Sequence, residues 1–403
     1  MALNGSNELS GQWSLLVGAA IGLTAGISAT LFYSLGAFIP ALESEFGWDR
    51  GNISLAAMAF TLAIFLGGVP VGRLCDRYGA AAVGATSLLL YAAGLVGMSF
   101  SVDRIEFLWI GYFVVALLGA GTTPIVMIRP VVSAFDRHRG LAMGIALTGI
   151  GFAGFWVPQF VTTLTEAQGW RAGYLGLAGV ATIAAPIVWI TFHRVGSGGG
   201  TRVAAATAGT EWNEAIRQRQ FWVLTAMTAL MALGVGGIVV HLVPLFRDAG
   251  ASAVEAAATA SILGLASVAG RLLVGGLLDL INPRVVTLGV LTLAATGAML
   301  IWGGGLSLAV PAVILLGFAA GAEVDLISYL TSRCFGARAY SSLYGWQYSI
   351  FALGFGIAPF FVGRLRDLLH SYDVALLCGA SLVLFAGLLS LSLGKFRYTA
   401  APR

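Results

Sequence analysis

Apolar segments long enough to cross a lipid bilayer recur along this sequence, separated by short polar breaks. A helix needs about 20 residues to span the hydrocarbon core. Hydrophobic residues make up 58% of the chain and charged residues 10%, against about 25% charged in ordinary soluble domains. No soluble core could bury so much apolar side chain. We therefore expect an all-α integral membrane protein with twelve transmembrane helices. The predicted spans are 14–39, 52–72, 80–101, 107–132, 141–163, 172–192, 219–245, 254–279, 285–304, 308–332, 341–361 and 373–394.

The distribution of basic residues predicts the orientation. Fifteen of the 22 Lys and Arg residues fall in loops and tails on one side and six on the other, while Arg271 lies within a span. Because cytoplasmic loops carry the excess of Lys and Arg, both termini are expected to be cytoplasmic. Residues 1–11 contain no Lys or Arg, and the first apolar run is longer than a signal-peptide core, so this run is expected to remain as a span. We expect a monomeric, multi-pass protein of the cell inner (cytoplasmic) membrane.

A segment rich in Gly, Ser, Thr and small residues, 193–218, is predicted to form a flexible cytoplasmic linker. It divides the chain into two predicted six-helix bundles, 1–192 and 219–403. The halves repeat one another: Gly72–Asp76 follows the second span, and Gly275–Asp279 ends the eighth. Parallel repeats of six helices are one plan of secondary transporters, with the substrate site at the repeat interface near the bilayer midplane.

The predicted span 254–279 contains a charged residue, Arg271. An arginine at bilayer depth costs about 2.5–3.5 kcal/mol on insertion scales and cannot lose its charge. Ser267 lies one turn earlier and Gly275 one turn later, so this face of the helix is small and polar and is expected to line a cavity. We interpret Arg271 and Ser267 as substrate-binding candidates. The alternative is an ion pair that only locks two helices together.

Two acidic residues lie in the predicted span 308–332. Glu323 and Asp325 are two residues apart and therefore point to nearly opposite faces. Asp325 shares a polar stripe and is assigned to the cavity, whereas Glu323 is assigned to a helix–helix contact and kept as a further proton-coupling candidate. Arg271 and Asp325 each lie eight residues from the cytoplasmic end of their helix, so they can share one depth. Such a carboxylate would hold the arginine and release it when protonated. The alternative is a permanent ion pair.

Several hydrogen-bonding side chains are further candidates. His241 lies near the extracytoplasmic end of the predicted span 219–245. Because histidine titrates near physiological pH, it is a candidate for substrate binding and for proton coupling. A hydrogen-bonded helix residue without a transport role is the alternative. The remaining substrate-binding candidates, each of which can also be a packing residue, are Tyr33, Tyr112, Gln347 and Tyr348.

The sequence GRLCDRYG at Gly72–Gly79 resembles the G-x-x-x-D-R-x-G loop of the major facilitator superfamily. Finer features resemble its monocarboxylate and oxalate–formate exchanging branches, and together the resemblance covers essentially the whole chain. These features are YSLGAFIPALESEFGWDR in the first span and its exit, FDRHRGLAMGIALTGIG at 135–151, HLVPLFRDAGAS at 241–252 and the arginine of the eighth span. The resemblance implies a twelve-helix carrier built from two pseudo-symmetric bundles.

The resemblance also implies that the Gly72–Gly79 loop is a latch, which holds the outward-open state and breaks for inward opening. Glycine would allow close helix approach, Asp76 would accept backbone N–H groups at a helix N-terminus, and Arg77 would pair with nearby acids. A static loop is the alternative. The gating candidates are Gly72, Asp76, Arg77, Gly79, Arg137 and Arg139.

Two departures from the family narrow the expected substrate. Animal-type monocarboxylate carriers place an aspartate four residues before the arginine of helix eight, where this chain has Ser267, and a lysine in helix one, which this chain lacks. Oxalate exchangers carry a second cation in helix eleven, whereas YGWQYSIF is uncharged. A dicarboxylate would need two cations, so one membrane arginine favours a monocarboxylate.

The expected function is secondary transport of a small organic monocarboxylate by alternating access, driven by symport of protons and needing no cofactor beyond the proton gradient. Organic-anion exchange is one alternative and extrusion of hydrophobic drugs another, although a positively charged centre argues against drugs. A membrane enzyme or a non-transporting receptor is a remote alternative. The four His and three Cys residues form no metal-binding or nucleophile–base set, and no basic run suggests nucleic acid.

Overall fold

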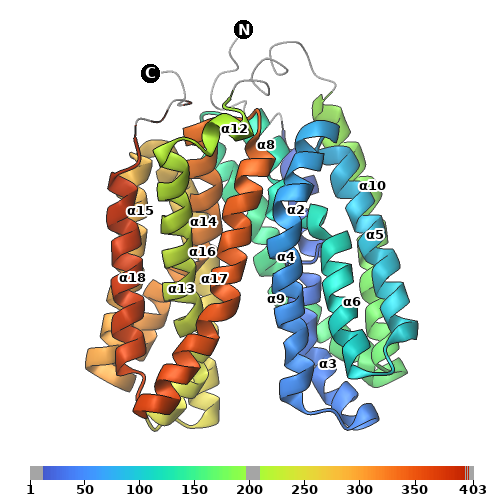
Figure 1. The fold of residues 1–403 in the computed structure, drawn as a ribbon. Helices are drawn as coiled ribbons and strands as arrows, with labels where there is room; N and C mark the ends of the chain where they lie inside the picture. Colours follow the sequence, from blue (N-terminus) through green and yellow to red (C-terminus); the bar gives the residue numbers. More distant parts are fainter. Residues whose placement is uncertain (1–11, 197–208, 395, 397, 399–403) are drawn as a thin grey trace. The chain divides into compact units, whose positions relative to one another are not determined.

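The computed structural model describes residues 12–196, 209–394, 396 and 398, and the regular structure within them is helical apart from one isolated bridge between Gly209 and Gly336. Figure 1 shows the course of the helices. Their bounds are α2 Trp13–Ala25, α3 Thr30–Phe46, α4 Arg50–Tyr78, α5 Ala80–Ser101, α6 Ile105–Leu118, η1 Ala120–Thr122, α7 Pro124–Met127, α8 Arg129–Ala134, α9 Arg139–Gln168, α10 Trp170–Gly196, α12 Trp212–Ala215, α13 Arg219–Asp248, α14 Ala253–Leu280, α15 Pro283–Gly304, η2 Gly305–Leu308, α16 Ala309–Phe335, α17 Tyr340–Leu369 and α18 Asp373–Leu391.

The helices match the twelve predicted spans in order. Among the described residues, ten helical segments are long and apolar enough to cross a membrane. One of them, Pro283–Phe335, contains two predicted spans, and the fourth predicted span is divided into the shorter apolar helices Ile105–Leu118 and Pro124–Ala134. The all-helical membrane fold is therefore confirmed, although α4, α9 and α17 extend beyond their predicted spans.

The first predicted span, 14–39, lies within the apolar segment Trp13–Phe46, but two helices, α2 and α3, form this segment instead of one. α2 ends at Ala25 because Gly26 takes an extended conformation, with ψ at 170°. The N–H of Ile27 then donates to the hydroxyl of Thr122, 2.9 Å away. Thr122 belongs to η1, which interrupts the fourth predicted span. The two helix breaks therefore contact one another, and Thr122 gives the N–H of Ile27 a hydrogen-bond acceptor that the interrupted helix lacks.

Contacts divide the described residues into two units. The first takes in residues of Met1–Arg137, Ile145–Glu211 and Phe335–Ser349, and the second those of His138–Gly144, Trp212–Cys334 and Ile350–Arg403. The beginning of α9 belongs to the second unit and the beginning of α17 to the first. Within the first unit α5 packs beside α10 and α4 beside α6, and within the second α15 packs beside α18 (Figure 1).

Residues 197–208 of the predicted linker lie outside the described residues, which resume at Gly209. The residues that follow Gly209 contact the turn between α16 and α17 through a hydrogen bond and an ion pair. The N–H of Thr210 donates to the carbonyl of Phe335 over 2.8 Å, and Glu211 forms an ion pair with Arg338. The short helix α12 follows directly.

Candidate functional site

An ion pair between Arg271 and Asp325 lies inside the second unit. Nη1 of Arg271 donates to Oδ1 of Asp325 over 3.2 Å, joining α14 to α16. The side chain of Asp325 is 2% exposed and that of Arg271 11%. In the described part of the structure, Oδ2 of Asp325 has no hydrogen-bond partner. The aspartate therefore holds the guanidinium through one oxygen, and the pair leaves hydrogen-bonding capacity unused at its centre.

The backbone of α14 around this pair is closely packed. A Cβ atom on Gly144 of α9 would lie 2.8 Å from the carbonyl oxygen of Arg271, and one on Gly321 of α16 would lie 2.7 Å from Cα of Ser267. The hydroxyl of Ser267 donates to the carbonyl of Gly264, one turn earlier on its own helix. Arg271 is therefore carried by a helix that two glycine-lined neighbours fix in place.

Glu323 is 1% exposed, in agreement with a position within a helix–helix contact. Its Oε1 has no hydrogen-bond partner among the described residues. A buried carboxyl group without a partner is costly when ionised. The structure thus places a second acid on α16, two residues from Asp325, but it does not bring this acid to Arg271.

His241 is bonded at both ring nitrogens. Nε2 lies 3.0 Å from the carbonyl oxygen of Pro359 and Nδ1 lies 3.2 Å from the hydroxyl of Tyr372. A carbonyl can only accept, so Nε2 carries the proton and Nδ1 of a neutral ring accepts from the tyrosine. Burial raises the pKa of Tyr372, which keeps its hydroxyl protonated for this role. This geometry joins α13 to α17 and to the loop before α18, and proton coupling at His241 stays a prediction.

The remaining substrate-binding candidates lie in the first unit. The ring of Tyr33 faces Gly154 of α9, whose added Cβ atom would lie 3.2 Å from it. The hydroxyl of Tyr348 is 3.3 Å from that of Ser28, in the break between α2 and α3. Gln347 is fully buried on α17. Their predicted contact with substrate stays a prediction.

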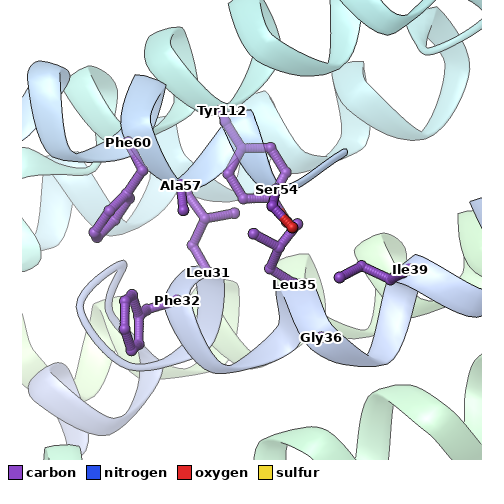
Figure 2. A pocket seen from close by; sticks show the side chains of 9 residues that line it. All are labelled: Leu31, Phe32, Leu35, Gly36, Ile39, Ser54, Ala57, Phe60 and Tyr112. Carbon is purple, nitrogen blue, oxygen red and sulfur yellow. The ribbon is translucent and has the colours of Figure 1, made fainter. Parts of the chain in front are cut away.

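An apolar pocket of about 250 Å³ lies between α3, α4 and α6 of the first unit (Figure 2). Tyr112 contributes its ring to this pocket, and its side chain is 1% exposed. The pocket is lined by Leu31, Phe32, Leu35, Gly36, Ile39, Ser54, Ala57, Phe60 and Tyr112. The Tyr112 ring borders this space, and its predicted contact with substrate stays a prediction.

Asp76 caps the beginning of α17 in the first unit. Its carboxylate accepts from the N–H groups of Ser341 and Ser342 at 3.1 and 2.9 Å. The hydroxyl of Ser342 and the guanidinium of Arg129 also donate to it. Carboxylates are favoured at a helix N-terminus, where N–H groups are unpaired and the helix dipole is positive. Gly72, one turn earlier on α4, lies directly against the backbone of Ser341. We call this contact the first junction.

Asp279 caps the beginning of α9 in the second unit. Its two carboxylate oxygens accept from the N–H groups of Gly140 and Leu141 at 2.8 and 3.0 Å. Gly275, one turn earlier on α14, lies against the backbone of Gly140, where its added Cβ atom would be 2.6 Å from the carbonyl oxygen. This second junction repeats the first with the same spacing of glycine and aspartate.

The other gating candidates surround these caps. Arg77 is exposed and its guanidinium lies 5.3 Å from the ring centre of Tyr78, so Arg129 rather than Arg77 pairs with Asp76. Gly79 has a φ of 84°, which favours glycine, at the turn into α5. Nη1 of Arg139 donates to the hydroxyl of Ser332 over 3.4 Å, and Arg137 is exposed.

Sequence reasoning missed part of this arrangement. The sequence singles out neither Arg129, which pairs with Asp76, nor Ser341 and Ser342, whose N–H groups Asp76 binds. Asp279 was recognised as a repeat of Asp76 but not as a cap. The repeated spacing of glycine and aspartate was the signal that could have identified Asp279. No group of three or more His, Cys, Asp or Glu residues that could bind a metal occurs among the described residues.

A comparison with models of protein families identifies the family of this chain. The model described as Major Facilitator Superfamily matches residues 21–359. This chain belongs to the Major Facilitator Superfamily. It is therefore a multi-pass membrane transporter and not an enzyme. Solved structures agree with the fold: the fucose:proton symporter of E. coli superposes with a TM-score of 0.74 at 14% identity, covering 96% of this chain and 100% of that one. The human organic anion transporter MFSD10 superposes with a TM-score of 0.72 at 14% identity, covering 94% and 99%.

Several relatives in sequence are named monocarboxylate transporters. Human monocarboxylate transporter 11 is 27% identical over 405 residues, covering 98% of this chain and 84% of its own length. Human monocarboxylate transporter 12 is 27% identical over 356 residues, covering 79% and 69%. The transporter is thus related to monocarboxylate transporters at low identity.

Proposed function

We propose that this transporter carries a small organic monocarboxylate by alternating access and takes up a proton with it. The observation that carries the proposal is the buried pair of Arg271 and Asp325 within a chain related to monocarboxylate transporters. A planar guanidinium binds a carboxylate through two parallel hydrogen bonds. Asp325 accepts one hydrogen bond from this guanidinium, and an incoming carboxylate would compete with Asp325 for it.

Protonation of Asp325 would resolve this competition. An ionised Asp325 holds Arg271, whereas the neutral acid releases it for the substrate. Binding of the proton and of the substrate then favour each other, and linkage makes this preference reciprocal. Glu323 is a second buried acid on the same helix, and His241 is a further candidate for carrying the proton.

The two junctions supply the proposed gate. We infer from the bias in basic residues that both termini and both junctions lie at the cytoplasmic face of the inner membrane. Opening toward the cytoplasm would require the beginnings of α9 and α17 to leave Asp279 and Asp76. Their capping hydrogen bonds would then favour the state that is closed on that side.

Uptake of a panel of labelled carboxylates into vesicles containing the purified protein tests the proposal. We expect accumulation of a monocarboxylate when an inward proton gradient is imposed and only equilibration without one. Accumulation driven by a second anion inside the vesicles, with no effect of pH, would indicate exchange instead. Absence of uptake for every carboxylate, together with uptake of uncharged or cationic compounds, would contradict the proposal.

A further inference from the structure

α14 and α16 run parallel, and their facing positions keep the same sequence offset at the ion pair and over the two turns before it. Positions that face each other across the two helices are separated by 54 residues at three successive turns. The first two turns are backbone contacts made at a glycine of α16, and the third is the ion pair. The facing pairs are Leu263 with Gly317, Ser267 with Gly321, and Arg271 with Asp325.

The contact at Gly321 leaves no space for a side chain. A Cβ atom there would lie 2.6 Å from the carbonyl carbon of Ser267 and 2.7 Å from its Cα, whereas ordinary contacts are 3.4–4 Å. Both obstructing atoms belong to the helix backbone and cannot rotate away. Gly270 makes the reciprocal contact, with an added Cβ atom 2.7 Å from the carbonyl carbon of Phe318. Any larger residue at Gly321 would therefore push the helices apart by about 1 Å.

We propose that Gly321 is a positioning residue, which sets the distance between the charges of Arg271 and Asp325. It lies one turn before Asp325, and Ser267 lies one turn before Arg271. The aspartate side chain is short and buried, and its hydrogen bond of 3.2 Å is already longer than the about 2.7–2.9 Å usual for charged partners. Separation of the helices would lengthen it further. This inference rests on the proposed function only where the pair of Arg271 and Asp325 is said to couple proton binding to substrate binding.

Other charged groups near Asp325 come from three helices. Arg271 faces it from α14, and Glu323 lies two residues away on α16 itself. From α9, Arg139 bonds Ser332, about two turns further along α16. Since only Arg271 forms an ion pair with Asp325 among the described residues, it is the charged group whose distance most affects that carboxyl group.

The test measures protonation of Asp325 by infrared spectroscopy of the carboxyl group in membranes, with Asp325→Asn to assign the signal. In Gly321→Ala a more distant Arg271 stabilises the carboxylate less, so half-protonation should move to higher pH by about half a unit to one unit. Gly276→Ala on α14 is the matched control, because an added Cβ atom there meets nothing within 4 Å. Gly321→Ala combined with Asp325→Glu should reverse part of this shift, because the glutamate side chain is one methylene longer and reaches Arg271 again.

An unchanged midpoint in Gly321→Ala, or equal shifts in Gly321→Ala and Gly276→Ala, would overturn the inference. If Gly321→Ala does not insert, Gly317→Ala provides the same test two turns away and should give a smaller shift in the same direction. A wild-type protein that carries no carboxylate would remove the proposed function, yet the infrared titration would still decide the role of Gly321.

Discussion

The two junctions share one arrangement but differ one turn before the glycine of α4 and of α14. Gly72 and Asp76 on α4 correspond to Gly275 and Asp279 on α14, and each aspartate caps the beginning of another helix. One turn before the glycine, the first junction has Gly68, which packs against Gly345 of α17. The second junction has Arg271 at that position. At this position one half of the repeat has a glycine that serves helix packing, and the other has a largely buried charge on the same helix face as its cap.

The caps also differ in the number of groups that they bind. Asp76 binds two N–H groups, a hydroxyl and the guanidinium of Arg129, whereas Asp279 binds the N–H groups of Gly140 and Leu141. Charged hydrogen bonds are about twice as strong as neutral ones. The first junction is accordingly the firmer cap, and the second combines a simpler cap with the candidate substrate site.

The largest effect is expected from the charge that distinguishes the two junctions. Arg271→Lys should reduce monocarboxylate uptake by about 100-fold, because lysine keeps the charge but loses the two-point grip on a buried carboxylate. Uptake in vesicles, normalised to folded protein, measures it. Arg247→Lys changes an exposed arginine at the end of α13 and is the control. Normal uptake by Arg271→Lys would remove Arg271 as the carboxylate anchor.

Neutralising the capping aspartates should have the next largest effect, and the size of the effect should differ between the two junctions. Asp76→Asn is expected to slow turnover by about tenfold while substrate affinity changes by less than about threefold, because the cap governs exchange between states rather than binding. Asp279→Asn should slow turnover less, since fewer groups depend on it. Turnover number and equilibrium affinity measured on both variants test this. Equal effects would mean that Arg129 and Ser342 add nothing to the first junction.

The smallest effect is expected from the hydroxyl that only the first junction has. Ser342→Ala removes one donor to Asp76 and should change turnover by about two- to fivefold, in line with about 1 kcal/mol for one hydrogen bond. Ser381→Ala, whose hydroxyl bonds a carbonyl of its own helix, is the control. A change in substrate affinity without a change in turnover would show that Ser342 acts on the site and not on the cap.

The fold was largely predictable because a bilayer imposes the length and apolarity of each helix. The break near Gly119 was foreseeable from its Gly, Thr and Pro residues. The break at Gly26 was not, since no proline marks it and the acceptor for the N–H of Ile27 beyond it is Thr122, a residue distant in sequence.

The candidate site was predictable where helix positions alone decide it. Equal distances from the helix ends placed Arg271 and Asp325 at one depth. The pairing of Asp76 with Arg129, and the close contact of Gly321 with Ser267, depend on how helices pack across the fold. Local patterns carry no information on that packing.

Substrate affinity as a function of pH, measured in vesicles for the wild type and Asp325→Asn, tests the central claim most directly. In the wild type, affinity should rise as pH falls, because protonated Asp325 leaves Arg271 to the substrate. Asp325→Asn imitates the protonated acid: it should bind at least as well, lose the pH dependence and exchange substrate without being driven by a proton gradient. An Asp325→Asn transporter that still concentrates substrate on an imposed pH gradient would contradict the account.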